Sequence, residues 1–361
     1  MIFKISDNQF RDIMHNPNLS LPIRWDGRNF ETTISNLLDE YISELDSCYE
    51  GKDEDEYHFN RINLDVDEIR MISNLLKQCI HEYHQGFPAT AFGTIKKVMT
   101  YLMRTPLKVY QKTGNLESLE TDRLHLFRLR RVSDAAKHTR KDLFHVPSCS
   151  RSMISTCRYS IAGYPSLYLT TSIELGIEEI GSANSDVLVS RFKLVRSQRV
   201  LNIRMLELGI RPQDFSEQEY EHGNDDRSAK DLDGINLLDK EICSNYLRWY
   251  PLIAACSFIR ANRNTPFSSE YIVPQLLMQW VRKQLGNNQL MGIRYFSCAS
   301  IRASELGFDY VFPVNNTKYG EGYCSILRDS FLLTNPVYLR DYDSTHRCER
   351  YLINWDELDK I

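Results

Sequence analysis

The sequence CRYSIAGYPSLYLTTSIELGIEEI at residues 157–180 combines a turn, a strand and a helix within one short segment. Gly163 suits the turn, and the apolar run 167–169 that follows has the length and composition of a buried strand. Thr171 and Glu174 have the spacing of a capping box, which marks the start of a helix. This segment therefore predicts a strand that leads directly into a short helix.

The glutamates of the expected helix differ in their surroundings. At about 100° per residue, the core face is predicted to consist of three isoleucines (Ile173, Ile177 and Ile180). Glu174 and Glu178 fall on the opposite side, as solvated glutamates do. Glu179 falls on the boundary, next to the helix end that Gly181 predicts, where a negative charge is unfavourable. An acid in such a place is a candidate functional residue.

Composition limits the classes of protein to which the chain can belong. It has 361 residues, enough for one large or two ordinary domains, with 42% hydrophobic and 25% charged residues, as in globular proteins. The net charge of −4 argues against nucleic acid as a partner, and no apolar run approaches the length of a membrane span. Nine cysteines without CxxC or zinc spacing indicate a reducing compartment and no metal site. We expect a cytoplasmic protein.

The pattern of elements predicts an α+β fold with a helical region at 1–120 and a mixed region at 121–361. The expected helices of the first region cover 63–83, with a capping box, and 88–102, with Lys96 and Lys97 on the exposed side. In the second region we expect strands at 126–130, 186–195, 200–203, 292–297 and 309–314, and helices at 237–259 and 274–285. An insertion near 205–265 is expected to contain the polar, acidic segment 213–236.

Two histidine motifs suggest other chemistry. His81 and His84 form HEYH, which is not the HExxH of zinc proteases and has no third ligand at a suitable spacing. RKDLFH at 140–145 matches the loose Arg-x4-His pattern of HEPN-type ribonucleases, although Pro147 follows at once. A ribonuclease would need this motif on a helix.

Arginines in the mixed region point to an anionic ligand. Arg128 and Arg158 each stand between small or apolar residues and an apolar or aromatic residue. A guanidinium held near a buried surface is suited to phosphate and diphosphate, because its forked geometry matches their oxygens.

Several segments in order resemble the RES domain, a family named for its arginine, glutamate and serine. They are LFRLR, FHVP, the segment 157–179, SEYIVPQLLMQW, GIRYFS and DYVFP, and together they span 124–314. The resemblance implies a fold similar to that of ADP-ribosyltransferase toxins. It also implies a toxin of a toxin–antitoxin pair that consumes NAD by phosphorolysis or hydrolysis.

The resemblance assigns roles to individual residues. It implies Arg128 and Arg158 as ligands of the phosphates of NAD, or of inorganic phosphate, and Glu179 as the catalytic acid beside the ribose. Tyr168 would stack on the nicotinamide or ribose, and Ser297 would bond to the ribose or a phosphate. Family members usually have Trp or Phe after the second arginine, where this chain has Tyr159, which we expect to contribute to NAD binding.

The function expected from this resemblance is cleavage of the nicotinamide–ribose bond of NAD, with NAD as substrate and no metal. Two alternatives remain open: transfer of ADP-ribose to a protein, and an inactive RES-like binding module. The expected partners are NAD, inorganic phosphate and an antitoxin protein. The helices of 1–120 could bind that antitoxin or a second copy of the chain.

Overall fold

The structure is a computed structural model that describes residues 2–50, 62–105, 107, 125–132, 138–181, 187–194, 205–215, 240–284, 290–315 and 322–342. The chain divides into two compact units. Unit 1 comprises Met1–Lys112 and Ile210–Trp280, and unit 2 comprises Thr113–Gly209 and Val281–Ile361. The expected strand at 200–203 and most of the acidic segment 213–236 lie outside the described residues.

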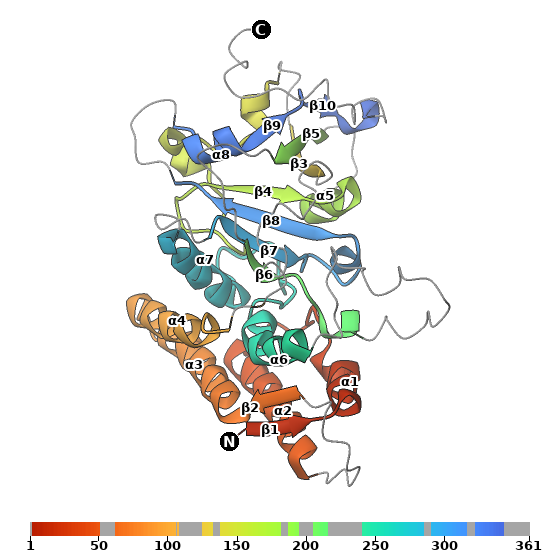
Figure 1. The fold of residues 1–361 in the computed structure, drawn as a ribbon. Coiled ribbons are helices and arrows are strands. Elements are labelled where there is room, and N and C mark those ends of the chain that lie inside the picture. Colours follow the sequence, from red (N-terminus) through yellow and green to blue (C-terminus); the bar gives the residue numbers. More distant parts are fainter. Residues whose placement is uncertain are drawn as a thin grey trace, which may run out of the picture. The chain divides into compact units, whose positions relative to one another are not determined.

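Unit 1 is helical with a small two-stranded sheet (Figure 1). Its helices are α1 (Asp7–His15), α2 (Phe30–Glu50), α3 (Val66–His84), α4 (Pro88–Leu102), α6 (Lys240–Ala255) and most of α7 (Ile272–Gln284). Its strands, β1 (Ile2–Ile5) and β2 (Ile62–Asp65), are antiparallel. The helix expected at 88–102 is present, and the helix expected at 63–83 begins only at Val66, because residues 63–65 belong to β2.

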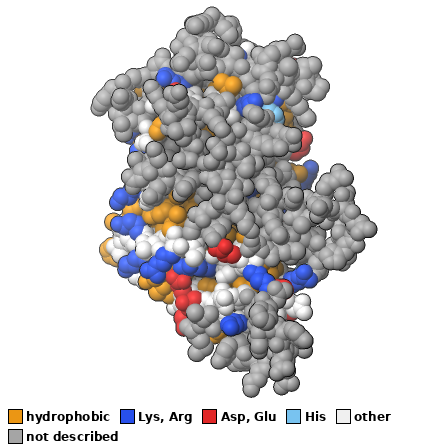
Figure 2. All heavy atoms as spheres, viewed as in Figure 1, with side chains coloured by type: hydrophobic (Ala, Val, Ile, Leu, Met, Phe, Trp, Pro, Cys, Tyr) orange, Lys and Arg blue, Asp and Glu red, His pale blue; other side chains and the backbone are white. Residues whose placement is uncertain are grey.

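Local sequence accounts for α3 and α4. Asp65 caps α3 by accepting a hydrogen bond from the backbone N–H of Glu68 at 3.2 Å, and Pro88 starts α4, where a missing N–H costs nothing. Lys96 and Lys97 are exposed, as expected. Figure 2 shows basic side chains gathered over the part of unit 1 that contains α4.

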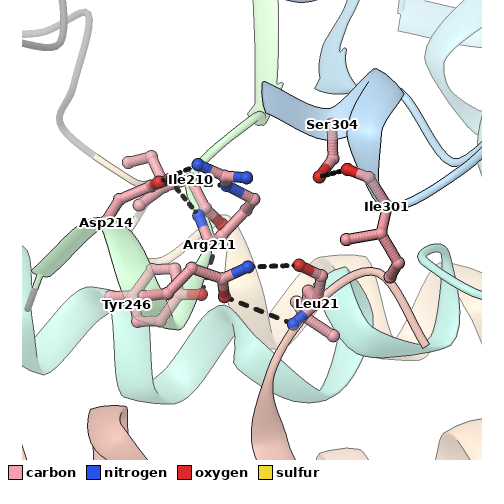
Figure 3. A network of polar contacts seen from close by, with 8 residues as sticks. Leu21, Ile210, Arg211, Asp214, Tyr246, Ile301 and Ser304 are labelled. Carbon is pink, nitrogen blue, oxygen red and sulfur yellow. Dashed lines mark hydrogen bonds and ion pairs between the residues drawn. The ribbon is translucent and has the colours of Figure 1, made fainter. Parts of the chain in front are cut away.

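Residues 210–280, which include most of the expected insertion, pack within unit 1. The buried hydroxyls of Tyr41 and Tyr250 donate to the carbonyl oxygens of Leu247 and Leu19, at 2.6 and 2.9 Å. Polar contacts add to this packing, and several of them are drawn in Figure 3. They comprise the Arg211–Asp214 ion pair at 2.6 Å, the bond from the Tyr246 hydroxyl to the Ile210 carbonyl at 3.2 Å, and the bonds between the Gln213 amide and the Leu21 backbone. This segment interrupts unit 2 in sequence but belongs to unit 1 in space.

Unit 2 is built on a mixed sheet (Figure 1). Its strands are β3 (His125–Arg131), β4 (Ser166–Thr170), β5 (Val187–Leu194), β6 (Met205–Leu208), β7 (Gly292–Phe296), β8 (Phe308–Pro313), β9 (Phe331–Leu333) and β10 (Val337–Tyr338). They lie in the order β10-β5-β3-β4-β8-β7-β6, with β9 also paired to β5. The pairs are antiparallel except for β6 and β7. Helices and a mixed sheet confirm the α+β class.

Short helices complete the described structure. The α-helices of unit 2 are α5 (Ile173–Ile180) and α8 (Ser325–Ser330). The 3-10 helices of the two units are Pro17–Leu19, Arg140–Leu143, Ser148–Met153, Pro212–Phe215, Ser269–Tyr271, Arg302–Glu305 and Leu339–Asp341.

The two faces of the sheet around β4 have different environments. Leu167 and Leu169 are fully buried and belong to a core cluster with side chains of β8, including Tyr310. Because side chains alternate along a strand, Tyr168 and Thr170 point to the opposite face. Thr170 lies opposite Asp309 of β8 in the strand register. One face of the sheet therefore packs the core, and the other presents polar groups.

Candidate functional site

Helix α5 is anchored at its first turn to the loop before β8. Ser172 is its N-cap, since the Ser172 hydroxyl oxygen accepts from the N–H of Leu175 at 3.1 Å and donates to the carbonyl of Leu306 at 2.8 Å. The prediction of Thr171 as the capping residue was wrong. The Thr171 hydroxyl instead accepts from the N–H of Phe308 at 2.8 Å.

The buried face of α5 also differs from the prediction. Leu175 and Gly176 are buried, whereas the isoleucines that were expected to form the core face are only half-buried. A Cβ on Gly176 would lie 2.6 Å from Cδ1 of Leu129, so the glycine lets the helix approach β3 closely. Glu179 follows these residues at helical spacing and lies on the same side. The absence of a side chain at Gly176, rather than the bulk of the isoleucines, orients the helix.

Glu179 contacts Ser297, which follows β7. The Ser297 hydroxyl donates to Oε1 of Glu179. The same hydroxyl oxygen accepts from the N–H of Ala299 at 3.1 Å, which directs its proton toward the acid. Ser297 is fully buried, whereas Glu179 is exposed. The bond from buried Ser297 thus holds the Glu179 carboxylate in place, and the carboxylate remains accessible to solvent.

A second acid, Asp309 at the start of β8, lies against Glu179. Its side chain is 3% exposed, and the Glu179 carboxyl acts on it electrostatically. Burial raises the pKa of Asp309 well above its ordinary value, the charge of Glu179 raises it further, and Arg158 opposes the shift. Asp309 was not among the residues that the sequence pattern predicted for the site. The available signal was an acid that begins an otherwise apolar strand.

Arg158 and Tyr159 lie in a tight turn. The turn is closed by Ser160, whose hydroxyl accepts from the N–H of Cys157 at 3.0 Å and donates to the Cys157 carbonyl at 2.9 Å. Arg158 is 8% exposed, and Tyr159 is 1% exposed with its ring centroid 4.6 Å from that of Tyr295. The turn therefore holds an almost fully buried guanidinium, which acts electrostatically on Asp309.

Arg128 and Tyr168 lie beside the point where the pairing of β3 and β4 ends. The register of these strands pairs only Phe127 with Thr170 among the described residues. Beside this point, Arg128 donates from Nη1 to the carbonyl of Phe144 at 2.5 Å, and Tyr168 acts electrostatically on it. Burial lowers the pKa of Arg128 to about 10, so the group remains cationic at neutral pH.

The predicted site residues fall into two adjoining groups. Glu179 and Ser297 are in direct contact, with Arg158 close to their partner Asp309. Arg128 and Tyr168 form the second group. Tyr295 links them, because Asp309, Glu179 and Tyr168 all act on its hydroxyl, and burial raises its pKa well above the ordinary value. The described residues contain no cluster of three or more His, Cys, Asp or Glu that could hold a metal ion.

The histidine motifs have structural roles. Arg140 begins a 3-10 turn rather than an α-helix, and His145 is fully buried. Nε2 of His145 accepts from the N–H of Cys324 at 2.9 Å, and Nδ1 lies 2.8 Å from the Val146 carbonyl, as in a neutral ring protonated at Nδ1. With both nitrogens engaged, His145 cannot serve as the catalytic histidine of a ribonuclease.

The HEYH histidines share a carboxylate in unit 1. Nδ1 of His81 and Nδ1 of His84 lie 3.2 and 2.7 Å from the two oxygens of Glu31. Nε2 of His84 lies 3.2 Å from the Ser269 hydroxyl. These contacts connect α3 to α2 and to the 3-10 helix Ser269–Tyr271 before α7, which is a structural role.

Because of His145, the free energy of unfolding of unit 2 should decrease at acidic pH. Burial lowers its pKa from 6.5 to about 4. As pH falls through this window the unfolded chain binds a proton that the folded chain does not, so the free energy of unfolding drops by about 1.4 kcal/mol per pH unit. Urea unfolding of wild type and His145→Gln between pH 4 and 7 tests this. The variant should have a shallower slope, and the exposed-site control His15→Gln should match wild type; equal slopes for His145→Gln and wild type would contradict the assignment.

Comparison with known proteins gives one informative relative. Over 340 residues, 90% of this chain and 69% of the relative, the chain is 27% identical to a protein of Bacillus subtilis (strain 168) named "Putative toxin YopC". No protein-family model matches the chain, and no solved structure matches it. The similarity indicates a relation to a protein named as a toxin. In the described residues, every helix is too short or too polar to cross a membrane.

Proposed function

We propose that the chain cleaves the nicotinamide–ribose bond of NAD, with water or inorganic phosphate as the acceptor. The observation that carries this proposal is the hydrogen bond between Ser297 and Glu179. It holds an exposed acid at a fixed place in the group that contains Arg158, next to the group that contains Arg128. An oriented carboxylate next to cationic groups is the arrangement that a negatively charged dinucleotide with a cationic leaving group requires.

The acid acts on the ribose. Loss of nicotinamide passes through an oxocarbenium-like state, as other glycosyl transfers do. The Glu179 carboxylate accepts a hydrogen bond from a ribose hydroxyl and stabilises the positive charge that grows on the sugar. Ser297 holds the carboxylate in place. This role differs from the one that the family resemblance implies, which is a direct contact of Ser297 with the ribose or a phosphate.

The arginines act on the phosphates. Arg158 is almost fully buried, and Arg128 keeps its charge despite burial. A guanidinium that has lost much of its water binds phosphate oxygens strongly. We assign both to the diphosphate of NAD, or one of them to an attacking inorganic phosphate.

The two tyrosines of the site have different roles: Tyr168 contacts NAD, and Tyr159 supports the turn that carries Arg158. Tyr168 stands on the polar face of β4 and is half-buried, which suits stacking on the nicotinamide or the ribose. Tyr159 is covered by Tyr295. We therefore assign Tyr159 to support of the turn that carries Arg158.

A toxin role would follow from this activity. The relation to a protein named as a toxin supports it, and NAD loss would stop growth of the cell that makes the enzyme. A toxin of this kind needs an antitoxin, and we propose such a protein as the partner.

Product analysis tests the proposed function. Purified protein is incubated with NAD labelled in the adenine, with and without inorganic phosphate, and the products are separated by chromatography. Nicotinamide release is expected in both cases, with ADP-ribose in water and its 1-phosphate ester if phosphate is the acceptor. Label that appears on added cell protein would instead support ADP-ribosyl transfer. Intact NAD under all conditions would contradict the proposal.

A further inference from the structure

A pair of carboxyl groups, one buried and one exposed, lies in the candidate site. Asp309 comes from β8 and Glu179 from α5, and the Glu179 carboxyl acts on Asp309 closely enough to raise its pKa. Two ionised carboxylates would repel each other and could not hydrogen-bond, because both are acceptors only. A proton on one of the two removes this repulsion and supplies a donor for a hydrogen bond between them.

The surroundings indicate which acid carries it. Glu179 is exposed and receives a hydrogen bond from Ser297, so its charged form is solvated and has a donor. Asp309 is 3% exposed, and within the described structure no N–H or O–H group donates to its Oδ2, which is shielded from water. An ionised carboxylate in that position would lack the donors that a buried charge requires. The proton therefore belongs to Asp309.

We propose that Asp309 is a positioning residue that stays protonated at neutral pH and donates a hydrogen bond to the Glu179 carboxylate. Together with Ser297 it gives the acid two donors, one from β8 and one from the residue that follows β7. The effect of Asp309 on catalysis rests on the proposed function. The protonation of Asp309 is independent of that function.

Other groups around the two carboxyls determine the pH range in which Asp309 stays protonated. Arg158 favours ionisation of Asp309, whereas Glu179 and burial oppose it. Tyr295, directly opposite Asp309 in the strand register, has a raised pKa and stays neutral. When the pH exceeds the pKa of Asp309, the second negative charge will repel Glu179. The rate of the reaction should then fall on the alkaline side.

Infrared spectroscopy of the full chain tests the protonation without NAD. Wild type at neutral pH should show the C=O stretch of a protonated carboxyl, and Asp309→Asn should lack it. The matched control Asp341→Asn, at an exposed position, should keep the band. A wild type without the band, or a band that persists in Asp309→Asn, would overturn the proposal. If Asp309→Asn does not fold, titration of the wild-type band decides: loss of the band below neutral pH would also overturn it.

Kinetics separate positioning from a purely structural role. Asparagine keeps an N–H donor but cannot ionise, so Asp309→Asn should retain most of the rate at neutral pH and lose the alkaline decline. Asp309→Leu removes the donor and should lower the rate about tenfold or more, since a hydrogen bond to a charged group is lost. An unchanged alkaline decline in Asp309→Asn would contradict the positioning role. If the infrared band is found but no variant or wild type releases nicotinamide, the proposed function fails and the protonated pair stands.

Discussion

Replacement of Glu179 by glutamine should lower nicotinamide release by about 10²–10³-fold, the typical loss when one preorganised electrostatic group is removed. Glutamine has nearly the same shape and can still accept the hydrogen bond from Ser297. It cannot supply the negative charge that opposes the developing charge on the ribose. The loss should therefore appear in kcat, with little change in NAD affinity.

Two glutamates on the same helix provide matched controls. Glu174 is exposed, and Glu178 lies 3.4 Å from Arg302 at the surface. Their glutamine variants should cleave NAD at the wild-type rate, as measured by chromatography of nicotinamide. A Glu179→Gln variant that is folded by circular dichroism and as active as these controls would exclude Glu179 as the catalytic acid.

Loss of Glu207 should destabilise unit 2 by about 3–5 kcal/mol, the cost of leaving one member of a buried ion pair uncompensated. Glu207 of β6 and Arg294 of β7 lie opposite each other in the register, with side chains 1% exposed and 2.8 Å between Oε2 and Nη1. Glu207 also accepts from the N–H of Gly209 at 2.5 Å. The Arg294 guanidinium lies 3.6 Å from the centroid of the Phe308 ring. Glu207→Leu leaves this guanidinium buried beside an apolar side chain.

The double variant Glu207→Leu/Arg294→Met is the control for this prediction. It removes both charges and should recover most of the stability lost in Glu207→Leu, because a buried pair can often be replaced by apolar residues of similar volume. Chemical denaturation of the three proteins measures both effects. A double variant no more stable than Glu207→Leu would show that packing, rather than the unpaired charge, causes the loss.

Local patterns in the sequence predicted most of the elements. The strands around Leu126, Val189 and Ile293 and the helices α3 and α4 follow from apolar periodicity and capping residues, which act over a few positions. The α+β class follows from their order along the chain. The insertion was recognised as an interruption, but its packing in unit 1 depends on long-range bonds such as that from Tyr41 to Leu247. Bonds between residues so distant in the chain leave no periodic signal.

The candidate site was only partly predictable for the same reason. The contact between Glu179 and Ser297 joins residues 118 positions apart. A helical wheel gave the wrong core face for α5, because it assigns large apolar side chains to the core. In the structure, Gly176 packs closely on Leu129 instead. Asp309 was missed because its importance comes from the strand register, which places it near α5.

The most direct test of the account is a crystal structure of Glu179→Gln with NAD, in which slow turnover preserves the substrate. The account predicts the nicotinamide ribose against residue 179, with the diphosphate on the guanidinium groups of Arg128 and Arg158. A dinucleotide bound elsewhere, or one whose adenine rather than nicotinamide end lies at residue 179, would contradict it.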